Sequence, residues 1–215
     1  MQLDVEYGNI SEEQARSMSW ACRWGVPDGY PAGATEPWIT DLVAGFVTAS
    51  GHRTVLETGG FQGHTSQALL QVLWMMGGGD LTVCELDPLR ASQIEQRLLG
   101  SGIGKHLELA ADWTGQQEIL EGPKWRVRNE DALSVIRSLP DAWLGVAWVD
   151  DDHGKQHVWD EIDALMPKMA TNGIILLHDV YGVTDLQEIV SVFKGYSLDL
   201  PRNGPAGGLG IIQCR

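Results

Sequence analysis

The stretch that decides the fold of this chain is Val55-Leu56-Glu57-Thr58-Gly59-Gly60-Phe61-Gln62-Gly63-His64-Thr65-Ser66. A short apolar run ends in an acid, a glycine-rich turn follows, and a segment of helical composition continues to about residue 76. Glycines adopt positive φ readily and let a ligand approach the backbone, and the N-terminus of the following helix offers free N–H groups. The stretch therefore predicts a strand–turn–helix unit that binds a ligand. A plain connecting turn is the alternative.

The spacing in this turn differs from that of a dinucleotide-binding turn. A pyrophosphate-binding turn reads G-x-G-x-x-G, whereas this one reads Glu-x-Gly-x-x-x-Gly from Glu57 to Gly63. An acid two residues before the first glycine would repel a pyrophosphate. We therefore expect Glu57 to orient the loop or to meet a cationic amino acid group.

The same strand–helix alternation continues along the chain. Apolar runs predict strands at residues 54–56, 81–84, 125–128, 144–149 and 173–177. Helices are predicted after them at residues 62–76, 88–99, 132–138, 155–169 and 186–193. Thr35 is the expected cap of a further helix before the first strand, and two strands at residues 196–200 and 209–213 follow the last helix. This order predicts an α/β fold in which helices cover both faces of a mostly parallel sheet.

Composition excludes several classes of partner. Lys and Arg number 15 and Asp and Glu 29, which gives a formal net charge of −14 over 215 residues. Proteins hold nucleic acids and anionic membranes through Lys and Arg, so we expect neither partner, whereas a small cationic ligand fits. The N-terminus lacks the features of a signal peptide, no apolar run approaches the roughly 18 residues of a membrane span, and the three cysteines suggest neither disulfides nor zinc. We expect a cytoplasmic protein.

Two parts of the chain lack the regular alternation of predicted strands and helices. Residues 1–35 are rich in Gly, Pro, Trp and acids and predict an N-terminal arm or lid, which leaves residues 36–215 as one domain. The least regular part of that domain is 101–122, where residues 112–120 predict an inserted helix.

Acidic residues follow nearly every predicted strand. Ligands of open α/β sheets bind outside the carboxyl ends of the strands, so these positions form the candidate site. They are Glu57, Glu85, residues 129–131, residues 150–153 and the pair His178-Asp179. The recurrence of acids at successive strand ends indicates a ligand-binding site more specifically than any single acid does.

The first turn resembles motif I of the class I S-adenosylmethionine-dependent methyltransferases, and Val83-Cys84-Glu85-Leu86-Asp87-Pro88 resembles their motif II. The resemblance implies a Rossmann-like fold with a seven-stranded sheet whose last strand is antiparallel. It also implies that the first turn wraps the methionine part of S-adenosylmethionine. The residues that this assigns to cofactor binding are Glu57, Gly59, Gly60, Phe61, Gly63 and Thr65.

Two further acids take cofactor roles from the same resemblance. Glu85 matches the acid that binds both ribose hydroxyls, a role that suits a carboxylate because its two oxygens can accept from a vicinal diol. Asp131 matches an acid near the adenine amino group, and it also fits the N-cap of the next helix.

The later strand ends, Val149-Asp150-Asp151-Asp152-His153 and Leu177-His178-Asp179-Val180, resemble the O-methyltransferase branch of that family. This resemblance implies methyl transfer to an oxygen of a small-molecule acceptor. Asp150 would take part in cofactor binding and catalysis. His153 would be the catalytic base, because an imidazole pKa near 6.5 suits proton abstraction at neutral pH; a structural or substrate-binding role is the alternative.

Metal-dependent members of the branch bind Mg²⁺ through acids after both strands, which implies Asp150 and Asp179 as ligands here. Val180 stands at the usual third position and cannot coordinate, so a further aspartate or water would replace that ligand. A solvated turn is the alternative for the three consecutive aspartates, and a hydrogen-bonded pocket wall is the expected role of His178.

Two rival functions stay open at this stage. A metal-dependent hydrolase would use the acids and histidines of residues 150–157 and 178–179, but it leaves the first turn and Glu85 unexplained. A binding protein that has lost methyl transfer would keep the cofactor pocket. Trp20 and Trp24 of the arm would cover an acceptor or pack on the domain or on a second subunit, so a homodimer is one expectation.

Overall fold

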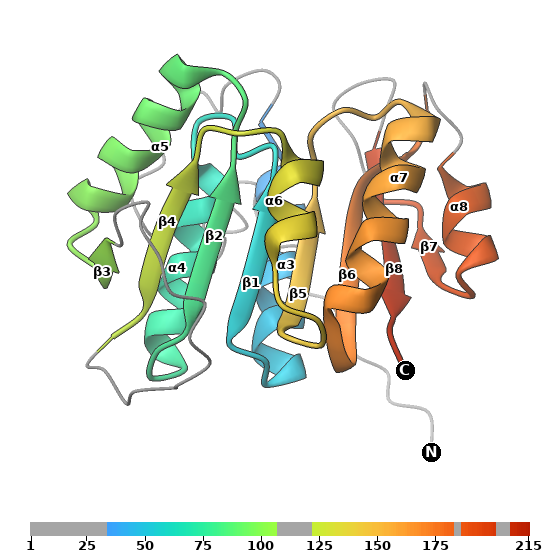
Figure 1. Ribbon diagram of the computed structural model, residues 1–215, viewed down its shortest axis with the longest axis horizontal. Helices are drawn as coiled ribbons and strands as arrows, with labels where there is room; N and C mark the ends of the chain where they lie inside the picture. Colours follow the sequence, from blue (N-terminus) through green and yellow to red (C-terminus); the bar gives the residue numbers. More distant parts are fainter. Residues whose placement is uncertain (1–33, 107–121, 183–185, 201–206) are drawn as a thin grey trace, which may run out of the picture.

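One eight-stranded sheet, in the order β3-β4-β2-β1-β5-β6-β8-β7, forms the centre of the molecule (Figure 1). The computed structural model describes residues 34–106, 122–182, 186–200 and 207–215. The strands are β1 (Thr54–Thr58), β2 (Asp80–Cys84), β3 (Lys105–His106), β4 (Lys124–Arg128), β5 (Leu144–Val149), β6 (Met169–Tyr181), β7 (Tyr196–Leu198) and β8 (Gly207–Gln213).

Strand β8 runs antiparallel to both of its neighbours, β6 and β7. The other pairs are parallel. The α/β fold class is confirmed: the seven expected strands are present, and the two-residue strand β3 extends the edge beside β4.

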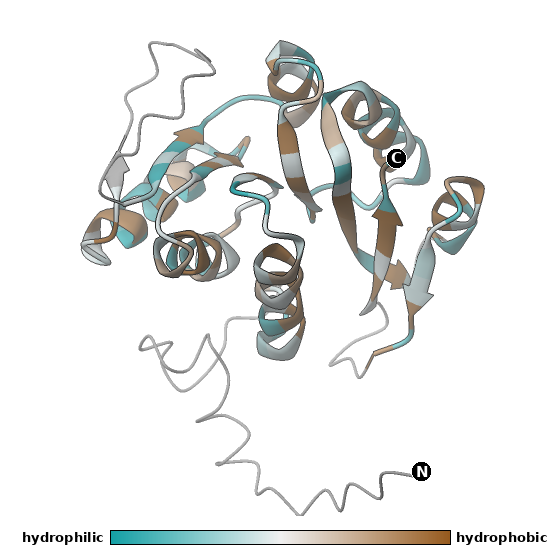
Figure 2. Ribbon diagram, turned by 90° about the horizontal axis from the view of Figure 1, so that it is seen from below, coloured by the Kyte–Doolittle hydropathy of each residue, from teal (hydrophilic) through white to brown (hydrophobic). Residues whose placement is uncertain are grey.

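Two layers of helices cover the sheet, with α3, α4 and α5 on one face and α6, α7 and α8 on the other (Figure 2). The helices are α3 (Pro37–Ser50), α4 (His64–Met75), α5 (Pro88–Gly100), α6 (Ala132–Ser138), α7 (Lys155–Leu165) and α8 (Gln187–Val192), with a 3₁₀ turn η1 (Met166–Lys168) after α7.

The central strands are apolar on both sides because each face packs on helices. Every residue of β5 is buried. Its Trp148 packs in the core under α3 and α4, whereas Ala147 and Val149 pack under α6 and α7. Successive side chains of a strand point to opposite faces, so one short apolar strand contributes to two cores.

Two predicted boundaries are wrong. The helix expected at 155–169 ends at Leu165 and continues as η1. The strand expected at 173–177 spans Met169–Tyr181, so His178 and Asp179 lie inside β6 rather than after it. The reason is that β8 keeps pairing with β6 as far as Tyr181, with an irregularity after His178.

Some expectations concern residues near or outside the described ranges. The predicted arm lies, up to residue 33, outside the described residues, as does the helix expected at 112–120. Thr35 does not cap α3: the N-cap is Glu36, without a side-chain hydrogen bond. Within the described ranges, no helix is both long and apolar enough to cross a membrane.

The close packing of the turn after β1 can be tested by comparing alanine substitutions at two glycines. Gly59 and Gly51 both have left-handed φ values, +74° and +72°, but a Cβ on Gly59 would lie 2.6 Å from Asp151 Cα, whereas one on Gly51 would meet open space. We expect Gly51→Ala to cost about 1 kcal/mol of unfolding free energy, the conformational cost alone. Gly59→Ala should cost about 2–4 kcal/mol because overpacking adds to it. Urea unfolding measures both, and equal losses would contradict the close contact.

Candidate active site

The carboxyl ends of β1, β2, β5 and β6 bring most of the predicted site residues together. In the sheet, β1 lies between β2 and β5. A pocket at this end of the sheet is lined by Ala34, Thr35, Glu57, Gly59, Gly60, Phe61, Gln62, His64, Thr65 and Asp150. It therefore contains six of the residues predicted to bind the cofactor.

The glycines let the turn after β1 lie against its neighbours. The N–H groups of Gly59 and Gly60 donate to the carbonyl of Cys84 at 3.0 and 3.2 Å. Gly63, with φ +77°, is the N-cap of α4 and packs on Ile94 of α5. Gly63 thus has a structural role outside the lining of the pocket, and its part in cofactor binding stays a prediction.

The Glu85 carboxylate is held at the edge of this turn. Its Oε2 accepts from the Phe61 N–H at 2.8 Å, and its Oε1 accepts from the Asp87 N–H at 3.0 Å. The Asn129 amide fixes the local backbone by donating to the Glu85 carbonyl at 2.9 Å. A carboxylate oxygen can accept two hydrogen bonds, so both oxygens keep capacity for a ligand.

Glu57 is a buried acid that faces the same pocket. The residue is 1% exposed, and its Oε2 has no hydrogen-bond partner among the described residues. Burial raises the pKa of Glu57 to about 8, Asp150 and Glu85 add to the rise, and Ser66 opposes it. A cationic group brought into the pocket would supply the missing compensation for this carboxylate.

Asp131 lies further from the turn. It is exposed and caps α6, accepting from the Ser134 N–H at 3.0 Å and from its hydroxyl at 3.1 Å. It is not among the residues that line the pocket. The N-cap role is therefore present, and the predicted adenine contact stays a prediction.

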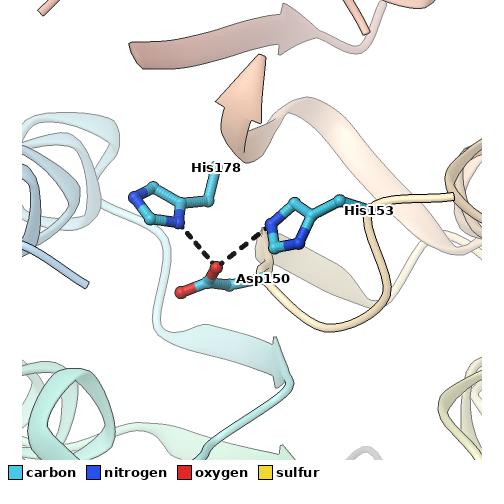
Figure 3. Close-up of side chains that lie close together, drawn as sticks. All are labelled: Asp150, His153 and His178. Carbon is cyan, nitrogen blue, oxygen red and sulfur yellow. Dashed lines mark hydrogen bonds and ion pairs between the residues drawn. The ribbon is translucent and has the colours of Figure 1, made fainter. Parts of the chain in front are cut away.

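The Asp150 side chain is the centre of a hydrogen-bonded cluster (Figure 3). Its Oδ1 accepts from His178 Nδ1 at 2.7 Å, and its Oδ2 accepts from the Thr35 hydroxyl at 2.6 Å. The other ring nitrogen of His178, Nε2, donates to Glu36 Oε2 at 3.1 Å. Both nitrogens of His178 thus face carboxylates, which is the environment of an imidazolium.

The charges of this cluster follow from its geometry. Burial lowers the pKa of His178, but the carboxylates of Asp150, Glu36 and Asp179 outweigh it and raise that pKa to about 10. Burial raises the pKa of Asp150, but His178, His153 and Thr35 outweigh it and hold the pKa well below its usual range. At neutral pH the pair is therefore a carboxylate and an imidazolium.

His153 occupies a more open position in the cluster. Its Nε2 lies 3.6 Å from Asp150 Oδ1 and 3.7 Å from Asp179 Oδ2, and its side chain is 34% exposed. The nearby carboxylate of Asp150, with that of Asp179, raises the pKa of His153 against the effect of burial. Of the two histidines, His153 is the one that an incoming molecule can reach.

These residues do not fit a Mg²⁺ ion at Asp150 and Asp179. Mg²⁺ requires an octahedron of oxygens, whereas the groups that lie against Asp150 Oδ1 are two imidazole nitrogens, His178 Nδ1 at 2.7 Å and His153 Nε2 at 3.6 Å. Val180, at the expected third position, is a buried apolar side chain. The imidazolium of His178 supplies positive charge in this place, and we assign no catalytic step to a metal here.

Sequence reasoning missed two contributors to the site. Glu36 contacts His178 across 142 residues of sequence, and Thr35 contacts Asp150 across 115. The position of Thr35 before a predicted helix indicated only helix capping, and no sequence pattern singled out Glu36. The buried His64, which lines the pocket, was also missed: burial and the nearby Arg97 lower its pKa to about 4, so it is neutral.

Comparison with known proteins identifies the family of this chain. The family model described as "Methyltransferase domain" matches residues 56–180, which include the first turn, Glu85, Asp150 and β6 as far as Val180. The chain belongs to this methyltransferase family. No curated protein sequence matches the chain significantly.

Solved structures of methyltransferases share the fold. An O-methyltransferase from Bacillus cereus in complex with SAH (S-adenosylhomocysteine) superposes with a TM-score of 0.65 at 14% identity, over 99% of this chain and 94% of that one. TomG, an O-methyltransferase of tomaymycin synthesis from Streptomyces achromogenes in complex with SAM (S-adenosylmethionine), gives 0.63 at 15% identity, over 96% and 92%. At these identities the likeness establishes the fold.

The imidazolium of His178 can be tested by NMR titration of its ring protons. Its pKa of about 10 lies above the ordinary 6.5. The raised pKa of His178 therefore stabilises the folded protein fully below pH 6.5 while Asp150 stays ionised, and that stabilisation is lost as the pH rises from 6.5 through 10. We expect Asp150→Asn to lower the His178 pKa by about one unit or more. Asp141→Asn, at an exposed acid, is the matched control; an ordinary His178 pKa in the unsubstituted protein would contradict the structure.

Proposed function

We propose that this methyltransferase transfers a methyl group from S-adenosylmethionine to a hydroxyl oxygen of a small-molecule acceptor. The observation that carries the proposal is one continuous arrangement of groups. The glycine turn with its two flanking carboxylates, Glu57 and Glu85, adjoins the Asp150–His153 cluster at the next strand end. Fold neighbours that are O-methyltransferases, in complex with SAH and with SAM, support the choice of cofactor.

The chain offers a distinct partner to two parts of that cofactor, the ribose and the methionine ammonium. Glu85, whose oxygens retain acceptor capacity beside the Phe61 N–H, suits a ribose diol. Glu57, buried in the pocket with an oxygen that lacks a partner among the described residues, suits the methionine ammonium. When bound, S-adenosylmethionine supplies the electrophilic methyl group.

The acceptor side requires a group that removes one proton. His178 is unsuited to this task because it holds its proton to about pH 10, but it fixes Asp150 in place. His153 is reachable from solvent and is neutral above its raised pKa. We assign to His153 the removal of the hydroxyl proton as the carbon–oxygen bond forms and the carbon–sulfur bond breaks. The imidazolium that results is stabilised by Asp150 and Asp179.

A hydrolase built on the same acids and histidines is the weaker candidate. It would give no role to the Glu85 carboxylate at the turn or to the buried Glu57. The net charge of −14 favours a small-molecule acceptor over nucleic acid.

The pH dependence of methyl transfer tests the proposal. Formation of S-adenosylhomocysteine is followed with a panel of catechols, phenols and sugar alcohols as acceptors. Since the base acts when deprotonated and the pKa of His153 is raised above 6.5, kcat/KM should rise with pH through a limb above pH 6.5. His153→Gln should remove that limb and lower kcat about 100-fold or more.

The matched control is His52→Gln, which changes a histidine outside the site and should leave the rate and the limb unchanged. Two results would contradict the proposal: no product from any hydroxyl acceptor, or a His153→Gln variant that keeps the rate and pH profile of the unsubstituted enzyme.

A further inference from the structure

A second cluster of ionisable side chains lies beside the one just described and has no part in it. Asp151, His157 and Glu161 each place one ligating atom within 4.8 Å of the other two. His157 Nε2 lies 3.1 Å from Asp151 Oδ2 and 3.8 Å from Glu161 Oε2. Asp150 and Asp151 are consecutive, yet the first contacts His178 and the second contacts His157.

The buried oxygens of this cluster lack hydrogen-bond partners. Glu161 is 0% exposed, and neither of its carboxyl oxygens has a hydrogen-bond partner in the part of the chain that the structure describes. The same holds there for Asp151 Oδ1 and for the Thr58 hydroxyl oxygen at the end of β1. A buried carboxylate left in this state is strongly unfavourable, so a positive charge has to accompany it.

The positive charge is either a proton or a metal ion. Without an ion, burial raises the pKa of Glu161 to about 10, Asp151 adds to the rise, and Thr58 opposes it. A cation that bound the two carboxylates would take the place of that proton.

The arrangement of donors suits a metal. His157 and Glu161 are four residues apart on α7, so they project from the same helix face. Asp151 approaches from the loop before that helix. The side chains of Asp151 and His157 are 20% and 25% exposed, so an ion can enter from solvent while Glu161 binds it from inside.

We propose that Asp151, His157 and Glu161 form a binding site for a divalent transition-metal ion such as Zn²⁺. One imidazole and two carboxylates are ligands of Zn²⁺, Mn²⁺ and Co²⁺, whereas Mg²⁺ and Ca²⁺ prefer oxygen alone. Three protein ligands leave a further position for water. The inference stands on this cluster and does not depend on the proposed methyl transfer.

The ion would join two parts of the chain that support the active site. It would connect α7 to the loop that also carries Asp150 and His153, and Gly59 of the first turn packs on Asp151 Cα of that loop. We assign the metal a positioning role, because none of its three ligands lines the pocket.

The test is calorimetric titration of the chelator-treated full chain with Zn²⁺, repeated with Co²⁺ to record its visible absorption. We expect binding that His157→Gln and Glu161→Gln each weaken about tenfold or more. His153→Gln changes a histidine of the neighbouring cluster and should leave this binding intact. An absence of binding to the folded chain would overturn the proposal, and so would binding that His153→Gln abolishes and His157→Gln retains.

Unfolding of the Glu161→Gln variant provides a second readout that does not depend on activity. Without metal, the variant should be at least as stable as the unsubstituted chain, since an amide replaces a buried carboxyl group. With Zn²⁺, only the unsubstituted chain should gain stability, as a ligand that binds the folded state requires. An equal gain in both proteins would overturn the proposal. Should Glu161→Gln fail to fold, the same unfolding experiment is carried out with His157→Gln, which changes a partly exposed residue. This variant should likewise gain no stability from Zn²⁺.

Discussion

The close contact between the turn after β1 and the end of β5 is the constraint on which the rest of the site depends. A side chain at Gly59 would collide with the backbone of Asp150 and Asp151. Because the turn has no side chain there, its backbone can lie against the β5–α7 loop. This contact brings Glu57, the second-last residue of β1, and the Asp150 cluster into one pocket, so a ligand held by the turn is adjacent to His153.

The balance of acidic and basic groups in the site determines which ligand charge it favours. Glu36, Asp150 and Asp179 surround one strongly basic histidine, His178, and the buried Glu57 lies beside them with a raised pKa that a cationic partner would lower. The acids outnumber that positive charge, and burial keeps water from screening them. Such a region favours a cationic ligand over an anionic one, which agrees with the unfavourable spacing of the turn for a pyrophosphate. A sulfonium cofactor that also carries an ammonium group has the matching charge.

Much of the fold could be predicted from local sequence patterns. The apolar runs of β1, β2 and β5 and the glycines at residues 59–63 gave the central strands and their first turn, because burial on both faces forces such runs. The end of β6 could not be predicted from local sequence patterns. His178 and Asp179 look like the start of a loop, but pairing with β8 keeps the chain extended through His178.

The location of a site residue was predictable where it depends on the end of a strand, as with Glu57 near the end of β1 and Glu85 directly after β2, while their cofactor roles stay predictions. It was not predictable where a partner comes from far along the chain. Glu36 and Thr35 reach His178 and Asp150 only after the sheet has assembled. Glu161 was missed for another reason: a single acid in an amphipathic helix reads as a solvent-facing residue, whereas the fold buries it completely.

The central claim is that the turn between β1 and α4, with Glu85 beside it, binds S-adenosylmethionine. Isothermal titration of the full chain with S-adenosylhomocysteine tests it most directly, with NAD as the control ligand. The account predicts one bound molecule per chain, no heat from NAD, and affinity about tenfold or more weaker in Glu85→Gln, because a hydrogen bond to a charged group is lost. An absence of binding to the folded chain, or equal affinity in Glu85→Gln, would contradict it.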